Sequence, residues 1–151
     1  TSNWDFIFFV GATHYLGIRP RFVGKHSLFR WPLTRFMHDM GGVPVDRSAS
    51  RNYVEQIVAA FAAEDDFRLV IAPEGTRGRG DSWRSGFYRV AVGAGVPLGL
   101  GYLDFARREV GLAGYLQLGG DPGRDLEAIA VRLGHHRGRR PEWAAPIRLR
   151  D

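Results

Sequence analysis

The chain has 151 residues, of which 44% are hydrophobic and 25% are charged, as is ordinary for one globular domain with a substantial core. It contains no Cys, which excludes disulfides, thiolate nucleophiles and Cys-ligated zinc. The formal net charge is +5, with twenty Arg against a single Lys, and such a balance attracts polyanions, whether nucleic acid or anionic lipid. No apolar run reaches the roughly 20 residues that a membrane-spanning helix needs.

Helices and short strands alternate from the start of the chain. Asn3 suits the N-cap of a helix over Trp4–Leu16, whose apolar character on nearly all sides predicts burial. Arg19–Val23 is typical of a short strand. Ser27–Met40 mixes aromatic residues with Arg, and its Pro suits the first turn of a helix that ends at the following Gly.

The alternation continues through the rest of the chain. We expect strands at Val43–Val45 and Phe67–Ala72, helices capped by Ser48 or Ser50 and over Ser85–Ala94, a hairpin of Pro97–Asp104 with Glu109–Ala113, and a last helix over Asp125–Leu133. This order predicts an α/β protein with a mixed, largely parallel central sheet flanked by helices, in a single domain over residues 1–151.

The stretch Leu69–Arg77 carries the clearest sign of function. Its four apolar residues suit a strand buried on both faces, which Pro73 should end. A carboxylate, a Gly, a hydroxyl and a guanidinium then follow at the carboxyl end of the strand, where open α/β sheets bind their ligands. The same residues also suit a polar turn crossed by an ion pair.

Two other segments repeat this arrangement. Gly41–Arg47 and Arg21–Lys25 each bring a cation to the end of a short apolar segment. Three such strand ends would place Lys25, Arg47 and Arg77 around one anion. Because the planar guanidinium fork donates two parallel hydrogen bonds, Arg suits a phosphate, so the sequence predicts a phosphate site.

The two central blocks carry a family resemblance. Gly-Gly-Val-Pro-Val-Asp-Arg at 41–47 and Pro-Glu-Gly-Thr-Arg at 73–77 resemble the phospholipid/glycerol acyltransferase family, and Gly95–Leu98 resembles its weaker fourth block. The family's first block is His-x-x-x-x-Asp, and Thr1–Asp5 looks like that block without its His. The likeness runs to about Asp104. Lys25–Phe29 and Trp83–Val90 further resemble a bacterial branch.

The resemblance implies a glycerol-3-phosphate acyltransferase-like fold and the transfer of a fatty acyl group from a thioester to a hydroxyl. The acceptor would be a glycerol-phosphate or lysophospholipid, as in 1-acylglycerol-3-phosphate acyltransferases of phospholipid biosynthesis. The donor would be acyl-CoA or acyl carrier protein, with no other cofactor and no metal. By the same resemblance Arg47, Glu74, Gly75, Thr76 and Arg77 bind the acceptor, Lys25 is an additional phosphate ligand, and Val96 and Pro97 lie near the acyl donor.

The resemblance also gives Asp5 the role of orienting a catalytic His. A positioned imidazole would take the proton of the attacking alcohol, and the Asp would stabilise the imidazolium. None of the five His residues has an Asp five positions later, and counting back from Asp5 leads to the position before Thr1. We therefore expect an N-terminally truncated chain that lacks its catalytic His.

The basic and aromatic segments predict a location. The segment around Trp31 and the Arg-rich tail Arg132–Arg140 suit an anionic membrane surface, although a helix with one face in the core and a solvated basic tail are alternatives. We expect the cytoplasmic face of a membrane, with peripheral binding or anchoring by segments outside this chain. The alternative function is a non-catalytic basic module that binds nucleic acid or anionic lipid, although no nucleic-acid motif occurs and no nucleic-acid partner is expected.

Overall fold

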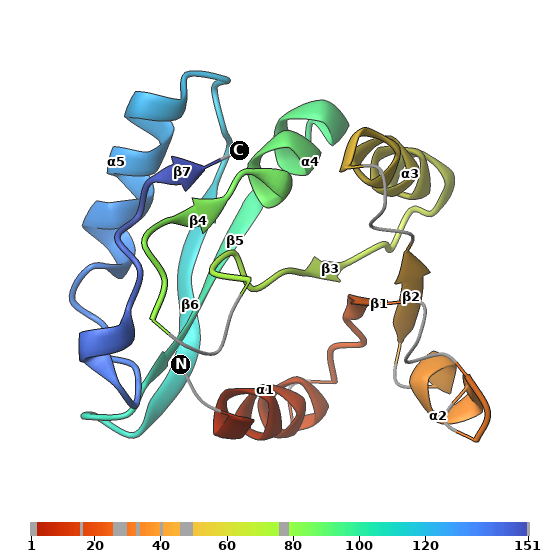
Figure 1. Cartoon of the computed structure of the whole chain (residues 1–151), viewed down its shortest axis with the longest axis horizontal. Coiled ribbons are helices and arrows are strands. Elements are labelled where there is room, and N and C mark those ends of the chain that lie inside the picture. The colour runs from red at the N-terminus through yellow and green to blue at the C-terminus, as the bar shows by residue number, and fades with distance from the viewer. Residues whose placement is uncertain are drawn as a thin grey trace.

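The computed structural model describes residues 3–15, 17–25, 30–32, 34–39, 41–45, 50–75 and 79–150 (Figure 1). In the first half of the chain the elements are α1 (Asn3–Tyr15), β1 (Arg21–Lys25), α2 (Thr34–Asp39), β2 (Gly42–Val45), α3 (Ser50–Ala63) and β3 (Leu69–Val70). The second half contains β4 (Trp83–Arg84), α4 (Gly86–Ala94), β5 (Leu98–Asp104), β6 (Glu109–Leu116), α5 (Pro122–Leu133), a 3-10 turn at Pro141–Trp143 and β7 (Leu149–Arg150).

The α/β class is confirmed, and the described strands form three small sheets. The order β2-β1-β3 makes a parallel three-stranded sheet, β4 pairs with β7 in parallel, and β5 with β6 forms the predicted antiparallel hairpin. The short strands β4 and β7 were not expected, because two residues carry no periodicity that a sequence pattern can show.

The prediction that the strand before Pro73 is buried on both faces is wrong. Val70 has 38% of its surface exposed and Leu69 is half-buried. Among the strands that the structure describes, only β1 pairs with β3, so β3 is an edge strand of that sheet. An apolar run shows that a segment is attracted to a core, but it does not show how many neighbours the strand will find.

Helix α4 contributes to two separate clusters of buried side chains. Phe87, Tyr88 and Ala91 belong to a cluster with residues of β4, β5 and α5, whereas Val90 packs with Ile57 of α3 and with Phe67. Figure 1 shows α4 between α3 on one side and the β5–β6 hairpin on the other. The helix ends at Ala94, because Gly95 adopts a left-handed conformation with φ 65° that suits a residue without a side chain.

Helix α5 begins three residues before its predicted start and covers the β5–β6 hairpin. Asp121 caps it by accepting hydrogen bonds from the amides of Gly123 and Arg124, at 3.0 and 3.3 Å, and Pro122 occupies the first helical position. Both are strong helix-start signals.

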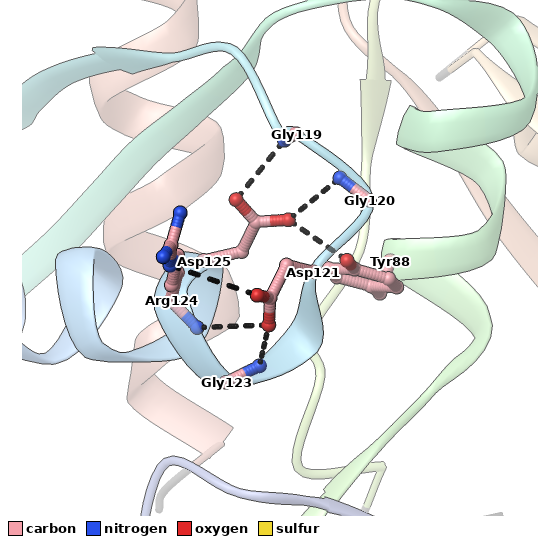
Figure 2. A network of polar contacts seen from close by, with 7 residues as sticks. All are labelled: Tyr88, Gly119, Gly120, Asp121, Gly123, Arg124 and Asp125. Carbon is pink, nitrogen blue, oxygen red and sulfur yellow. Dashed lines mark hydrogen bonds and ion pairs between the residues drawn. The ribbon is translucent and has the colours of Figure 1, made fainter.

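A buried carboxylate joins α5 to α4 (Figure 2). Asp125 accepts a hydrogen bond from the Tyr88 hydroxyl at 2.8 Å and from the amides of Gly119 and Gly120, each at 3.0 Å. These bonds, led by that of Gly119, lower the pKa of Asp125, although burial opposes the shift. Burial and the bond to Asp125 raise the pKa of Tyr88 to about 12.

Removal of this carboxylate should destabilise the fold more than removal of the hydroxyl. Asp125→Ala leaves the Tyr88 hydroxyl and two amides without their acceptor, and we expect it to lower the free energy of unfolding by about 2–4 kcal/mol. Tyr88→Phe deletes a single hydrogen bond and should cost about 1–2 kcal/mol. Urea unfolding followed by circular dichroism measures both, and equal losses would contradict the network.

The same pair predicts a stability profile that declines at both pH extremes. The pKa of Asp125 is lowered from 3.8, so its contribution is present in full above that pH and is lost as pH falls through the lowered pKa. The pKa of Tyr88 is raised from 10.0 to about 12, so its contribution is complete below pH 10 and is lost between those values. Unfolding free energies measured across pH should show that Tyr88→Phe removes the alkaline decline.

Candidate functional site

The parallel sheet aligns the carboxyl ends of its strands at one edge. Lys25, the last residue of β1, pairs in register with Val45, the last residue of β2, and Val70 of β3 pairs with Phe22. Because β1 pairs in parallel with both β2 and β3, the three strands run in the same direction. Parallel pairing is what the shared phosphate site requires of the backbone.

Several predicted ligands lie outside the described residues. They are Arg47, Thr76 and Arg77, and for Lys25 the backbone alone is described. The convergence of three cations on one anion thus stays a prediction. Glu74 and Gly75 are described, in a turn closed by a hydrogen bond from the Gly75 amide to the Ala72 carbonyl at 3.3 Å.

Gly75 is at a position where a side chain would be strained. Its φ is +63°, in the left-handed region that L-residues rarely adopt, and a Cβ there would collide with the Arg84 side chain, whose Cδ would be 2.7 Å away. Glu74 beside it is half-buried. The Gly of the Pro-Glu-Gly-Thr-Arg block is therefore favoured by the backbone conformation, and a larger residue would also displace the Arg84 side chain.

Arg84 is a residue of this site that the sequence analysis missed. Its amide donates to the Pro73 carbonyl at 2.8 Å, and its side chain lies against Gly75. The sequence offered one sign of this residue: in the short segment between two Gly residues, an apolar residue, Trp83, is followed by a cation. That signal is too short for a strand prediction, and only the pairing with β7 gives it a structure.

Asp5 lies in the first turn of α1 and is half-buried, with its Oδ1 atom shielded from solvent. One helical turn later the Phe8 ring packs edge-on against Phe105, with centroids 5.8 Å apart. Phe105 directly follows β5, so α1 contacts the far end of that strand. Val96 and Pro97 precede its other end, about 20 Å away at the usual rise per residue.

A His–Asp contact between distant described residues could not be found from any fixed spacing in the sequence. The His136 Nδ1 atom is 3.6 Å from Asp104 Oδ2, and the imidazole stacks on Tyr102 with centroids 3.6 Å apart. The Asp104 carboxylate also accepts the amides of Ala106 and Arg107, each at 3.0 Å. Led by the Arg107 amide, such bonds hold the pKa of Asp104 below its ordinary value. The contact serves to fix the turn after β5.

Other site types find no support within the described ranges. No group of three His, Asp or Glu side chains there is arranged as metal ligands. No helix in that part of the chain has the length and apolar character needed to cross a bilayer. Two shallow depressions, one along α5 and one beside Tyr102 and His136, contain none of the predicted site residues.

Comparison with known proteins identifies the class. A family model described as Acyltransferase matches residues 1–99, about two thirds of the chain, and this region contains the Asp5, Arg47 and Pro73–Arg77 blocks. The chain therefore belongs to the acyltransferase family, as its motifs predicted, and has a general acyltransferase function. No curated protein and no solved structure gave a significant match to it.

The contact between Gly75 and Arg84 predicts a coupled effect on stability. Gly75→Ala should cost about 1–2 kcal/mol for the left-handed backbone, plus the cost of displacing the Arg84 side chain. In an Arg84→Ala background the second cost should disappear, so the two substitutions should couple in a double-mutant cycle.

Gly95→Ala is the matched control, because its φ of +65° is close to that of Gly75 and a Cβ there meets nothing within 4 Å. Additive effects of Gly75→Ala and Arg84→Ala, measured by thermal unfolding, would show that Arg84 does not occupy the space beside the turn.

Proposed function

We propose that the protein is an O-acyltransferase of phospholipid biosynthesis, which moves a fatty acyl group from an acyl thioester to the hydroxyl of a glycerol-phosphate or lysophospholipid acceptor. The observation that carries the proposal is the family match over residues 1–99. That range includes, in their family order, the blocks for the catalytic Asp, the acceptor phosphate and the acyl-donor region. A 1-acylglycerol-3-phosphate acyltransferase-like activity is the most specific form of the proposal.

The chemistry requires a base, because a neutral alcohol is a poor nucleophile near pH 7. A His five residues before Asp5, at the position that immediately precedes Thr1, would take the proton of the acceptor hydroxyl as it attacks the thioester carbonyl. Asp5 would fix the imidazole orientation and stabilise its cation. The half-buried position of Asp5 in the first turn of α1 suits this role, since a fixed helix restrains the carboxylate.

The acceptor phosphate would bind at the carboxyl edge of the β2-β1-β3 sheet. Parallel pairing of β1 with β2 and β3 supports this placement, because the loops that carry the predicted ligands start from a common edge. The assigned ligands are Lys25, Arg47, Glu74, Gly75, Thr76 and Arg77. Gly75 contributes its backbone, which its positive φ turns away from the extended course of β3.

The acyl donor would be carried by coenzyme A or by acyl carrier protein. Val96 and Pro97, assigned to the donor side, join α4 to β5. Since they and α1 lie toward opposite ends of β5, they would contact a part of the donor remote from the thioester carbonyl. A long pantetheine arm or acyl chain could span that separation.

The protein would act at the cytoplasmic face of a membrane, where lipid acceptors reside. Trp31 is 90% exposed, and the exposed Arg30 precedes it in the chain. The Arg35 side chain on α2 is 95% exposed. An exposed aromatic ring among cations is the composition that binds an anionic lipid surface.

The catalytic proposal predicts that a single added residue restores activity. The chain extended by one His before Thr1 should transfer acyl groups to lysophosphatidate or glycerol 3-phosphate, whereas the chain that begins at Thr1 should be about 10²–10⁴ times slower. In the extended chain, Asp5→Asn should lower the rate by a similar factor. An added Gln is the matched control. Equal activity with and without the His would assign the base to another residue, and His136→Gln would then test the Asp104 contact.

The membrane proposal predicts salt-sensitive binding to vesicles. The protein should bind vesicles that contain anionic lipid more tightly than neutral vesicles, and the difference should shrink as salt screens the charges. Trp31→Ala should weaken binding to both kinds, because it removes the apolar part of the contact. Cosedimentation measures each affinity, and equal binding to neutral and anionic vesicles would contradict the electrostatic part.

A further inference from the structure

Two Arg side chains occupy neighbouring positions on the outer face of the β4–β7 sheet. In this parallel pair Trp83 is in register with Leu149, and Arg84 is in register with Arg150. Trp83 is buried in the core and Leu149 packs against the same cluster, whereas both Arg residues are exposed. Adjacent parallel strands lie about 4.8 Å apart, so the two side chains start side by side on one face.

Neither Arg is neutralised within the part of the chain that the structure describes. There the Arg21 and Arg68 side chains contact Glu64 and Asp66, with N···O distances of 3.2 and 2.8 Å. No corresponding carboxylate lies within 4.0 Å of Arg84 or Arg150 among the described residues. Like charges directly opposite one another on a sheet are destabilising, so the pair carries a cost that a bound anion would relieve.

Backbone hydrogen bonds hold this pair beside the Pro-Glu-Gly turn. The Arg84 amide donates to the Pro73 carbonyl at 2.8 Å, and the Arg84 side chain lies against Gly75. On the other side, the Ser85 amide donates to the Arg150 carbonyl at 3.1 Å. Figure 1 shows β4 and β7 side by side, with β4 leading directly into α4. The pair is thereby fixed to the same turn that the proposed function assigns to the acceptor.

We propose that Arg84 and Arg150 form an anion-binding position that takes the phosphate group of a phosphate ester. Two Arg side chains that start from neighbouring positions can each offer parallel N–H donors to phosphate oxygens, a geometry that a point charge such as Lys does not supply. The position extends the acceptor region beyond the family-matched residues, since Arg150 lies outside 1–99. Its place in acyltransfer rests on the proposed function, whereas the binding of a phosphate ester does not.

The test is direct binding to the full chain, with glycerol 3-phosphate and coenzyme A as separate probes of the acceptor and the donor phosphate. Arg84→Gln and Arg150→Gln should each weaken the binding of one of these probes by about tenfold or more, the usual effect of losing a charge-assisted hydrogen bond. Arg84→Lys keeps the charge but loses the planar guanidinium fork, so its affinity should lie between those of the parent chain and Arg84→Gln.

Arg124→Gln is the matched control, because that side chain is 90% exposed on α5 and its removal makes the same change in net charge. The control should bind both probes as the parent chain does. Circular dichroism and thermal unfolding of each variant separate a lost ligand contact from a lost fold. A variant that unfolds is replaced in the comparison by Arg150→Lys, whose affinity for the probe should also lie between those of the parent chain and a Gln variant.

The outcomes are distinct. A loss confined to glycerol 3-phosphate assigns the pair to the acceptor, and a loss confined to coenzyme A assigns it to the donor. The inference is overturned if the folded Gln variants bind both probes with unchanged affinity. It is also overturned if the variants lose affinity for anionic vesicles alone. If the variants weaken binding but the His-extended chain transfers no acyl group, the site stands and the proposed function fails. If the variants transfer acyl groups with unchanged KM for both substrates, the proposed function stands and the Arg84–Arg150 site fails.

Discussion

The arrangement of this protein depends on a helix that is covered on two sides. Most surface helices bury one face and leave the other to water. Helix α4 instead packs Phe87, Tyr88 and Ala91 against one cluster and Val90 against another. A Cβ added at Gly93 would lie 3.2 Å from a methyl group of Val58, which shows how closely α3 approaches it. Helix α4, which is nine residues long, therefore connects the two clusters directly.

This constraint also positions the candidate site. Strand β4 precedes α4 by one residue, so fixing the helix fixes the point at which Arg84 meets Pro73. The turn after β3 lies at a sheet edge, where its own strand makes only two register pairs. The bond from Arg84 compensates for that weak attachment, because it anchors the turn to the better-packed half of the molecule.

Local signals in the sequence predicted several elements, whereas contacts between distant segments were not predictable. The helix expected over Ser27–Met40 was wrong at its start, because Trp31 and Pro32 lie in a turn and α2 covers Thr34–Asp39. The left-handed Gly95 ended α4 as expected, and the Asp121-Pro122 start of α5 was present in the sequence but assigned too late. By contrast, the exposure of Val70 depends on which strands become its neighbours. The same limit applies to the candidate site: the family resemblance named Glu74 and Gly75 as candidates, but Arg84 reaches their turn only through a strand pair, and Asp104 meets His136 across 32 positions of sequence.

The pairing of β4 with β7 has a consequence for the order in which the molecule assembles. About 65 residues separate the two strands, so their contact has a high loop-closure cost and belongs late in folding. During synthesis from the N-terminus, the α3–α4 contact and the hairpin can form while Arg150 is still being added. Until β7 arrives, β4 has no strand partner in its sheet and Arg84 is held by the Pro73 bond alone. The surface beside the turn would thus be completed by β7, after the α3–α4 contact and the hairpin have formed.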